Sequence, residues 1–250
     1  MRRATVQQIK SGVNAADYII SEAGETVYEV ASNYISKELM TPLHMRGSDG
    51  DYSFRRNIVQ GAVSIKQYDV MDLYQGEEKQ GYICGNAVYF SGSKTYTIEW
   101  AGRRFTMYDV GLGSQGVKLP IYEDEQQVAL VEKDASVRNM LDSYEIYTIE
   151  DALFPLAALA ALYYDRDNFS NAGKHSAASV QSSTSFSLDD QQLARYDEAW
   201  VAPFLTPEEQ AARVTQATKP LPKPLRILLK IAPFLLGAIT LYLFYLMALK

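Results

Sequence analysis

Six residues of this chain match a spacing used for nucleotide binding. Gly111-Leu112-Gly113-Ser114-Gln115-Gly116 has the pattern GxGxxG and follows a strand-like stretch. This motif binds a pyrophosphate where the glycines lead into the N-terminus of a helix. Here Val117–Tyr122 follows, with Pro120 and residue types that are typical of strands. We therefore interpret residues 111–116 as a flexible glycine loop between strands, and not as a cofactor site.

Residue types that act as nucleophiles or bind transition metals are scarce. The chain has one cysteine, Cys84, and two histidines, His44 and His175. These cannot form a zinc site, and no GxSxG nucleophile motif occurs. Cys84 fits a small buried strand residue better than a nucleophile, because no histidine lies near it in the sequence. A single cysteine also fits a reducing compartment.

The acidic run Glu123-Asp124-Glu125 has the chemistry of a cation site or a general acid-base pair. A solvated turn explains this run more simply. The sequence thus predicts no catalytic residue, no metal site and no cofactor, and it favours a non-enzymatic protein.

Basic residues offer a further kind of site. The pairs Arg55-Arg56 and Arg103-Arg104, with Lys94 and Lys118, would contact lipid phosphates if they met on one face. Adjacent strand residues point to opposite faces, so solvated strand positions are the simpler interpretation.

The overall charge also limits the partners. Five of the 24 Lys and Arg residues follow residue 218, but none of the 30 Asp and Glu residues do, so residues 1–218 carry a net charge of −11. An acidic body argues against nucleic-acid binding and against broad adhesion to an anionic membrane.

The elements that must carry these residues are mostly strands. From Asp17 to Ile149 apolar and polar residues alternate, with turn residues every eight to twelve positions. The clearest hairpin joins Tyr18–Ser21 to Thr26–Val30, with Gly24 at a positive φ. Thr95–Trp100 alternates most regularly, and Ala101-Gly102 turns it into Arg103–Val110. Other predicted turns are Met45–Gly50 and the stretch between Gly76 and Gly81. We expect ten to twelve strands. A closed barrel of these strands would leave fewer exposed edges than a sandwich, so we predict a barrel.

One apolar stretch would fill such a barrel. The thirteen residues between Asp151 and Asp165 carry no charge and no side-chain amide. A helix this apolar on every side must be enclosed, and it is too short to cross a bilayer. We predict that it is the central helix of the barrel. Its alanines keep it thin, and Leu153, Phe154, Leu156, Leu159 and Leu162 fill the space around it.

The last part of the chain is different in composition. We divide the sequence into an N-terminal segment, 1–16, a barrel, 17–167, a polar linker with short helices, 168–224, and a transmembrane helix, 225–249. Leu188–Leu205 could be a short docking helix, and Thr206-Pro207-Glu208-Glu209 has the form of a capping box. Ile231–Leu249 gives nineteen uncharged residues, and Arg226 and Lys230 precede it. The positive-inside rule places the barrel in the cytoplasm and the C-terminus outside the plasma membrane.

Residues 105–165 also resemble a known family. The stretches that carry the resemblance are Phe105–Gly111, Leu119–Asp124, Gln127–Lys133 and Tyr144–Tyr147, followed by the apolar helix that ends Tyr163-Tyr164-Asp165. Together they resemble the bacterial branch of the tubby C-terminal-like superfamily, which includes the phospholipid scramblase and LURP-one-related families. The resemblance covers about residues 15–167. It implies a twelve-stranded antiparallel barrel around a central hydrophobic helix, and it assigns no site residue.

Our functional expectation combines these features. The chain is predicted to be a single-pass membrane protein whose tubby-like barrel binds a protein partner or a lipid headgroup on the cytoplasmic face. The alternative is a scramblase-like protein that handles phospholipids.

Overall fold

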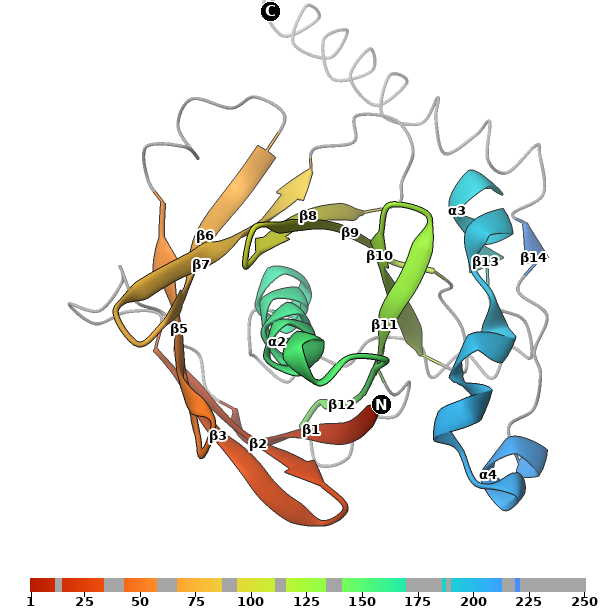
Figure 1. Cartoon of the computed structure of the whole chain (residues 1–250), viewed down its shortest axis with the longest axis horizontal. Coiled ribbons are helices and arrows are strands. Elements are labelled where there is room, and N and C mark those ends of the chain that lie inside the picture. The colour runs from red at the N-terminus through yellow and green to blue at the C-terminus, as the bar shows by residue number, and fades with distance from the viewer. Residues whose placement is uncertain are drawn as a thin grey trace, which may run out of the picture.

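Twelve antiparallel strands close into a barrel around one helix in the computed structural model (Figure 1). The structure describes residues 1–11, 15–33, 43–57, 67–86, 94–110, 116–133, 141–169, 186–187, 190–212 and 219–220. Each strand pairs with its neighbours in the sequence, and β1 pairs with β12 to close the ring. The strands are β1 Arg2–Ser11, β2 Ala15–Glu22, β3 Glu25–Asn33, β4 Leu43–Gly47, β5 Gly50–Arg56, β6 Gln67–Gln75, β7 Glu78–Asn86, β8 Thr95–Trp100, β9 Arg103–Tyr108, β10 Val117–Glu123, β11 Gln126–Lys133 and β12 Ser143–Thr148.

The apolar helix fills the barrel, as predicted. A short 3₁₀ turn, η1 (Asp151–Leu153), leads into α2 (Phe154–Phe169), which lies within the ring of strands in Figure 1. Pro155 lies in the first turn, where its missing N–H breaks no helical hydrogen bond. Leu153, Leu156, Leu159 and Leu162 are at most 2% exposed, and Ala157, Ala158, Ala160 and Ala161 are fully buried. The prediction of a closed barrel with a central helix is confirmed.

Alternation along the strands explains which side chains meet this helix. In β8 Tyr96, Ile98 and Trp100 are buried in the main core, and Phe105 and Met107 of β9 join them. In β11 Ala129 and Val131 belong to this inner core, whereas Leu130 belongs to a second, outer cluster. That strand is therefore covered on both faces.

The two ends of the barrel are built differently. Six tight connections lie at the end where α2 begins. Five are the hairpins β2–β3, β4–β5, β6–β7, β8–β9 and β10–β11, and the sixth links β12 to η1. We call this end the turn end. Its β2–β3 hairpin has Ala23 and Gly24 at φ 51° and 85°, and its β8–β9 hairpin has Ala101 and Gly102 at 51° and 75°. Both predicted hairpins are thus present. The helix ends at the opposite end, which we call the far end.

A short segment crosses the outside of the barrel. It consists of α3 (Asp190–Arg195), η2 (Glu198–Phe204) and α4 (Pro207–Ala212), and we call residues 190–212 the strap. In Figure 1 it lies beside β10 and β11. Val201 packs with Leu130 and Tyr147 in the outer cluster, and Trp200 donates to the carbonyl of Gln127 at 3.1 Å. The docking helix expected at Leu188–Leu205 is instead divided into α3 and η2, and η2 docks on the barrel.

The predicted capping box at the start of α4 is also present. The N–H of Thr206 donates to Glu209 Oε2 at 2.8 Å, and the N–H of Glu209 donates to Thr206 Oγ1 at 3.2 Å. Before the strap, β13 (Phe186–Ser187) pairs in parallel with β14 (Lys219–Pro220), which follows it.

Several predicted boundaries need correction. Residues 1–16 are not a separate segment, because Arg2–Ser11 forms β1 and closes the ring. Met45 lies in β4, so the turn predicted at Met45–Gly50 is confined to Ser48 and Asp49. Gly81 lies inside β7, where it is needed because a Cβ atom would meet the carbonyl oxygen of Glu99 at 1.9 Å.

The predicted membrane span, 225–249, lies outside the described residues. Within the described ranges, no helix is long and apolar enough to cross a membrane.

Candidate functional site

Most residues singled out for chemistry take structural positions. Gly111–Gln115 lies outside the described residues, and Gly116 has φ 77° just before β10. Cys84 is buried in β7, and burial raises the pKa of its thiol to about 11, so it is protonated at neutral pH. His44 is exposed on β4, and His175 lies outside the described residues. In the part of the chain that is described, no three His, Cys, Asp or Glu side chains are grouped to hold a metal ion.

The acidic run 123–125 forms the turn between β10 and β11. Glu123 pairs with Arg103 at 2.6 Å, and Glu125 pairs with Arg195 of the strap at 3.3 Å. The hydrogen bond from Arg103 lowers the pKa of the Glu123 carboxyl group. Asp124 adopts φ 50°, as a tight turn requires. These contacts give the run a structural role as an ion-paired turn.

The basic residues considered for lipid binding lie on different strands, and four of them pair with acidic side chains. Arg55 pairs with Glu77 and Lys118 pairs with Glu132. Arg103 bridges Glu123 and Glu150. Lys94 contacts Asp167 of α2 at 3.2 Å. Arg56 and Arg104 are exposed on β5 and β9. Within the described residues, the structure does not bring this set together into one basic patch.

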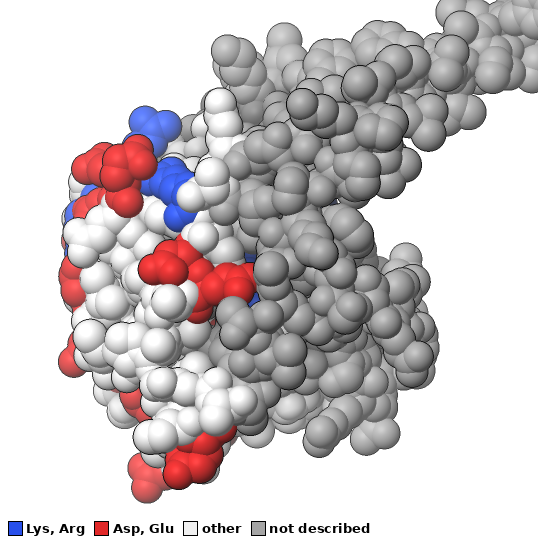
Figure 2. All heavy atoms as spheres, turned by 90° about the vertical axis from the view of Figure 1, so that its right-hand side faces the viewer, with Lys and Arg blue, Asp and Glu red and all other residues white. Residues whose placement is uncertain are grey.

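The turn end is instead acidic. Five of its six connections carry Asp or Glu, at Glu22, Glu25, Asp49, Asp51, Glu77, Glu78, Glu123, Asp124, Glu125, Glu150 and Asp151. Several of these carboxylates pair with arginine, as Glu22 does with Arg2 at 2.6 Å. Figure 2 shows the side of the barrel on which the strap lies, with several groups of acidic side chains and few basic ones.

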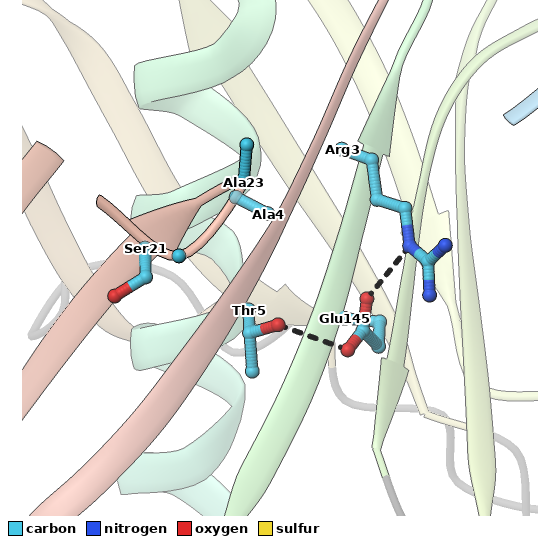
Figure 3. A pocket seen from close by; sticks show the side chains of 7 residues that line it. Arg3, Ala4, Thr5, Ser21, Ala23 and Glu145 are labelled. Atoms are coloured by element: carbon cyan, nitrogen blue, oxygen red, sulfur yellow. Dashed lines mark hydrogen bonds and ion pairs between the residues drawn. The ribbon is translucent and has the colours of Figure 1, made fainter. Parts of the chain in front are cut away.

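The outer wall has a hollow over β12, β1 and β2. Its volume is about 290 Å³, and it is lined by Arg3, Ala4, Thr5, Ser21, Ala23, Gly24 and Glu145 (Figure 3). Thr5 Oγ1 donates to Glu145 Oε1 at 3.0 Å, and Arg3 Nε donates to Glu145 Oε2 at 3.1 Å. Arg3 also reaches Glu209 of the strap at 2.6 Å. The strap therefore ends beside this hollow.

The hollow is lined by one basic and one acidic side chain, Arg3 and Glu145, and Glu209 of the strap pairs with the same arginine. Arg3 faces the carboxylates of Glu145 and Glu209. Burial lowers the pKa of its guanidinium, but the hydrogen bonds to these two carboxylates outweigh burial and raise the pKa further above its usual range. Side chains of both Arg3 and Glu145 are about one-third exposed. An arginine held in this way is a poor site for an anion. The partly exposed Glu145 carboxylate can accept a further hydrogen bond from a cationic group.

Sequence reasoning missed these residues because they lie far apart in the chain. Arg3 and Thr5 fall in the segment set aside as 1–16, and Glu145 lies 140 residues after Thr5. The alternation of Ala4 and Val6 with Arg3 and Thr5 was a signal for a strand, since Ala4 and Val6 are buried. Only barrel closure, which places Thr5 opposite Glu145, brings them together.

Fold and site define the class of this protein as a closed, helix-filled antiparallel barrel with an outer hollow lined by Arg3 and Glu145. No protein-family model, curated protein or solved structure matches the chain.

Proposed function

We propose that this chain is a non-enzymatic binding module, anchored in the plasma membrane by residues 225–249, whose barrel binds a protein partner on the cytoplasmic face. Membership of the tubby C-terminal-like superfamily is part of this proposal and rests on the resemblance of residues 105–165. The anchor and its orientation rest on the apolar run and the flanking charges of the sequence.

One observation carries the proposal that binding takes place outside the barrel. The side chains of α2 occupy the interior, where Phe154, Leu159 and Tyr163 are fully buried. A ligand that entered the barrel would have to displace this helix and expose the core. Binding to the outer wall needs no such change, and the hollow beside Arg3 and Glu145 is a concave surface on that wall.

Charge favours a protein partner over a lipid headgroup. Arg3 of the hollow pairs with two carboxylates, Glu145 in the lining and Glu209 of the strap, and the adjacent turn end is acidic. Phosphate groups of a lipid would meet this surface with like charge. A basic side chain of a protein would meet complementary charge at Glu145.

The test blocks the hollow in the full-length chain. Ser21→Arg places a long cationic side chain on its outer face, opposite Thr5. His44→Arg is the matched control, because His44 is exposed on the outside of β4. After crosslinking in native membranes, we expect Ser21→Arg to reduce capture of the partner by at least about tenfold, a loss of 1.4 kcal/mol or more of binding free energy. His44→Arg should capture the partner as the unmodified chain does.

Two results would count against the proposal. Equal capture by Ser21→Arg and the unmodified chain would remove the hollow as the binding site. Faster lipid flip-flop in liposomes that contain the purified full-length chain would favour the scramblase-like alternative.

A further inference from the structure

The far end of the barrel encloses a buried cluster of ionisable groups that the proposed function does not use. Asp165, in the C-terminal half of α2, is fully buried. Its carboxyl group accepts a hydrogen bond from the hydroxyl of Tyr18 in β2 at 2.6 Å and another from Tyr144 in β12. Three elements of the fold thus meet at one carboxyl group.

A buried ion pair lies in the same cluster. Lys133 of β11 contacts Asp142, which precedes β12, and their side chains are 2% and 0% exposed. Asp142 Oδ2 has no hydrogen-bond partner. One ammonium group therefore faces two buried carboxyl groups, those of Asp142 and Asp165, so full ionisation would leave a net buried negative charge.

A third carboxyl group, that of Asp109, lies half-buried on the other side of the helix end. Asp109, which follows β9, accepts a hydrogen bond from the N–H of Lys94 at 3.0 Å. Facing Asp109 are Asp167 and Tyr164 of α2, the Lys94 side chain and Tyr68 of β6. Asp167 itself is held by Lys94 at 3.2 Å.

Among the described residues, the charges around the helix end do not balance when every group is ionised. Besides these residues, Arg166 pairs with Asp69 of β6. The described ionisable groups here include five carboxyl groups and three cations. The carboxyl groups are those of Asp69, Asp109, Asp142, Asp165 and Asp167, and the cations are Lys94, Lys133 and Arg166. The C-terminus of a helix also carries partial negative charge, which disfavours carboxylates there. Two protons would balance the charges of these eight described groups.

We propose that Asp109 and Asp165 form a proton-dependent lock on the C-terminal end of α2, which holds the helix end in the barrel when both are protonated and loosens it when they ionise. Burial is the main cause that raises the pKa of each group, to about 6 in both cases. For Asp165, the nearby Asp142 carboxylate raises the pKa further, whereas Tyr144, Tyr18 and Lys133 oppose the shift.

The direction of the pH dependence follows from these shifts. The folded state binds each proton more tightly than the unfolded chain, in which an aspartate has a pKa of about 3.9. Stability from these groups is therefore fully present below about pH 4 and declines as the pH rises to about 6. The ion-paired Glu123 and Glu150, with lowered pKa values, act in the opposite direction at lower pH.

Hydrogen–deuterium exchange of the full-length chain in detergent micelles tests the lock. We expect amides in residues 160–169 to lose protection by about tenfold or more between about pH 5 and about pH 7.5, after correction for intrinsic exchange. Amides near the turn end of α2, at residues 154–158, should change much less. The double variant Asp109→Asn with Asp165→Asn should remove the pH dependence, because asparagine stays neutral. Asp51→Asn, at an exposed turn-end position, should keep it.

A second measurement does not depend on the variants folding. Carboxyl resonances of the unmodified chain should show two aspartates that titrate near pH 6. Two outcomes would overturn the lock: equal protection of residues 160–169 at both pH values, or titration of all aspartates below about pH 5.

Discussion

The hydroxyl group of Tyr163 joins the central helix to a break in the barrel wall. The β6–β7 ladder is irregular between Tyr68 and Met71, and Asp69 adopts φ 50° there. Such a bulge leaves backbone groups without their ladder partners. Tyr163 replaces them, since its oxygen accepts from the N–H of Gly85 at 3.0 Å and its O–H donates to the carbonyl of Asp69 at 2.9 Å.

Removing this hydroxyl should be costly. Tyr163→Phe leaves both backbone groups buried without a partner, and each such group costs about 1–3 kcal/mol. We expect urea unfolding to show a loss of about 2–4 kcal/mol in the free energy of unfolding. Tyr82→Phe, on the same sheet but partly exposed, is the control and should cost less than about 0.5 kcal/mol. Similar losses for the two variants would show that the Tyr163 hydroxyl has no special role.

Tyr163 also shows which features of the fold can be predicted from the sequence and which cannot. The apolar run shows that Tyr163 belongs to an enclosed helix, because enclosure depends only on composition. The bulge at Asp69 could not be predicted, since it depends on which residues of two strands pair. Likewise, Asp165 reads as the boundary of the helix in the sequence, whereas barrel closure places Tyr18 and Tyr144 on its carboxyl group.

At the scale of elements, the strap is part of the folded domain. Tyr108 and Tyr122 stack on the outer wall with ring centres 5.6 Å apart, and their hydroxyls donate to the carbonyls of Gln192 and Arg195 in α3. The sequence predicted a docking helix near Leu188–Leu205 from scattered apolar residues. It could not show the docking surface, because β10 and β11 read simply as apolar strands, and burial on both faces emerges only in the fold.

Loosening the strap tests this role. Val201 is 2% exposed against Leu130 and Tyr147, so Val201→Asp places a charge in an apolar cluster. We expect the strap to detach and become sensitive to protease while α2 stays protected within the barrel. Ala199→Asp, at an exposed position of η2, should leave the strap resistant. If protease spared the strap equally in both variants, docking through Val201 would be contradicted.

At the scale of the whole molecule, the strap shortens the connection to the proposed membrane anchor. β13 precedes the strap and contacts α3, and β14 follows the strap and pairs with β13. The chain therefore leaves the strap close to the point where it enters. Four residues, 221–224, separate β14 from the proposed anchor at 225–249. Four residues span at most about 14 Å when fully extended. A barrel on such a connection should present the α3 side, and not the opposite wall at β4, to the bilayer.

Energy transfer to an acceptor lipid measures this orientation. A donor dye on Ala194→Cys, an exposed position of α3, should transfer more strongly than a dye on His44→Cys, because β4 lies opposite β10 in the ring. Cys84 should not compete for the dye at neutral pH, since it is buried and its pKa is raised to about 11. Inserting about 20 Gly and Ser residues after Pro224 should reduce the difference, because a flexible chain frees the barrel to turn. Equal transfer from both positions in the unmodified connection would show that the short tether does not orient the barrel.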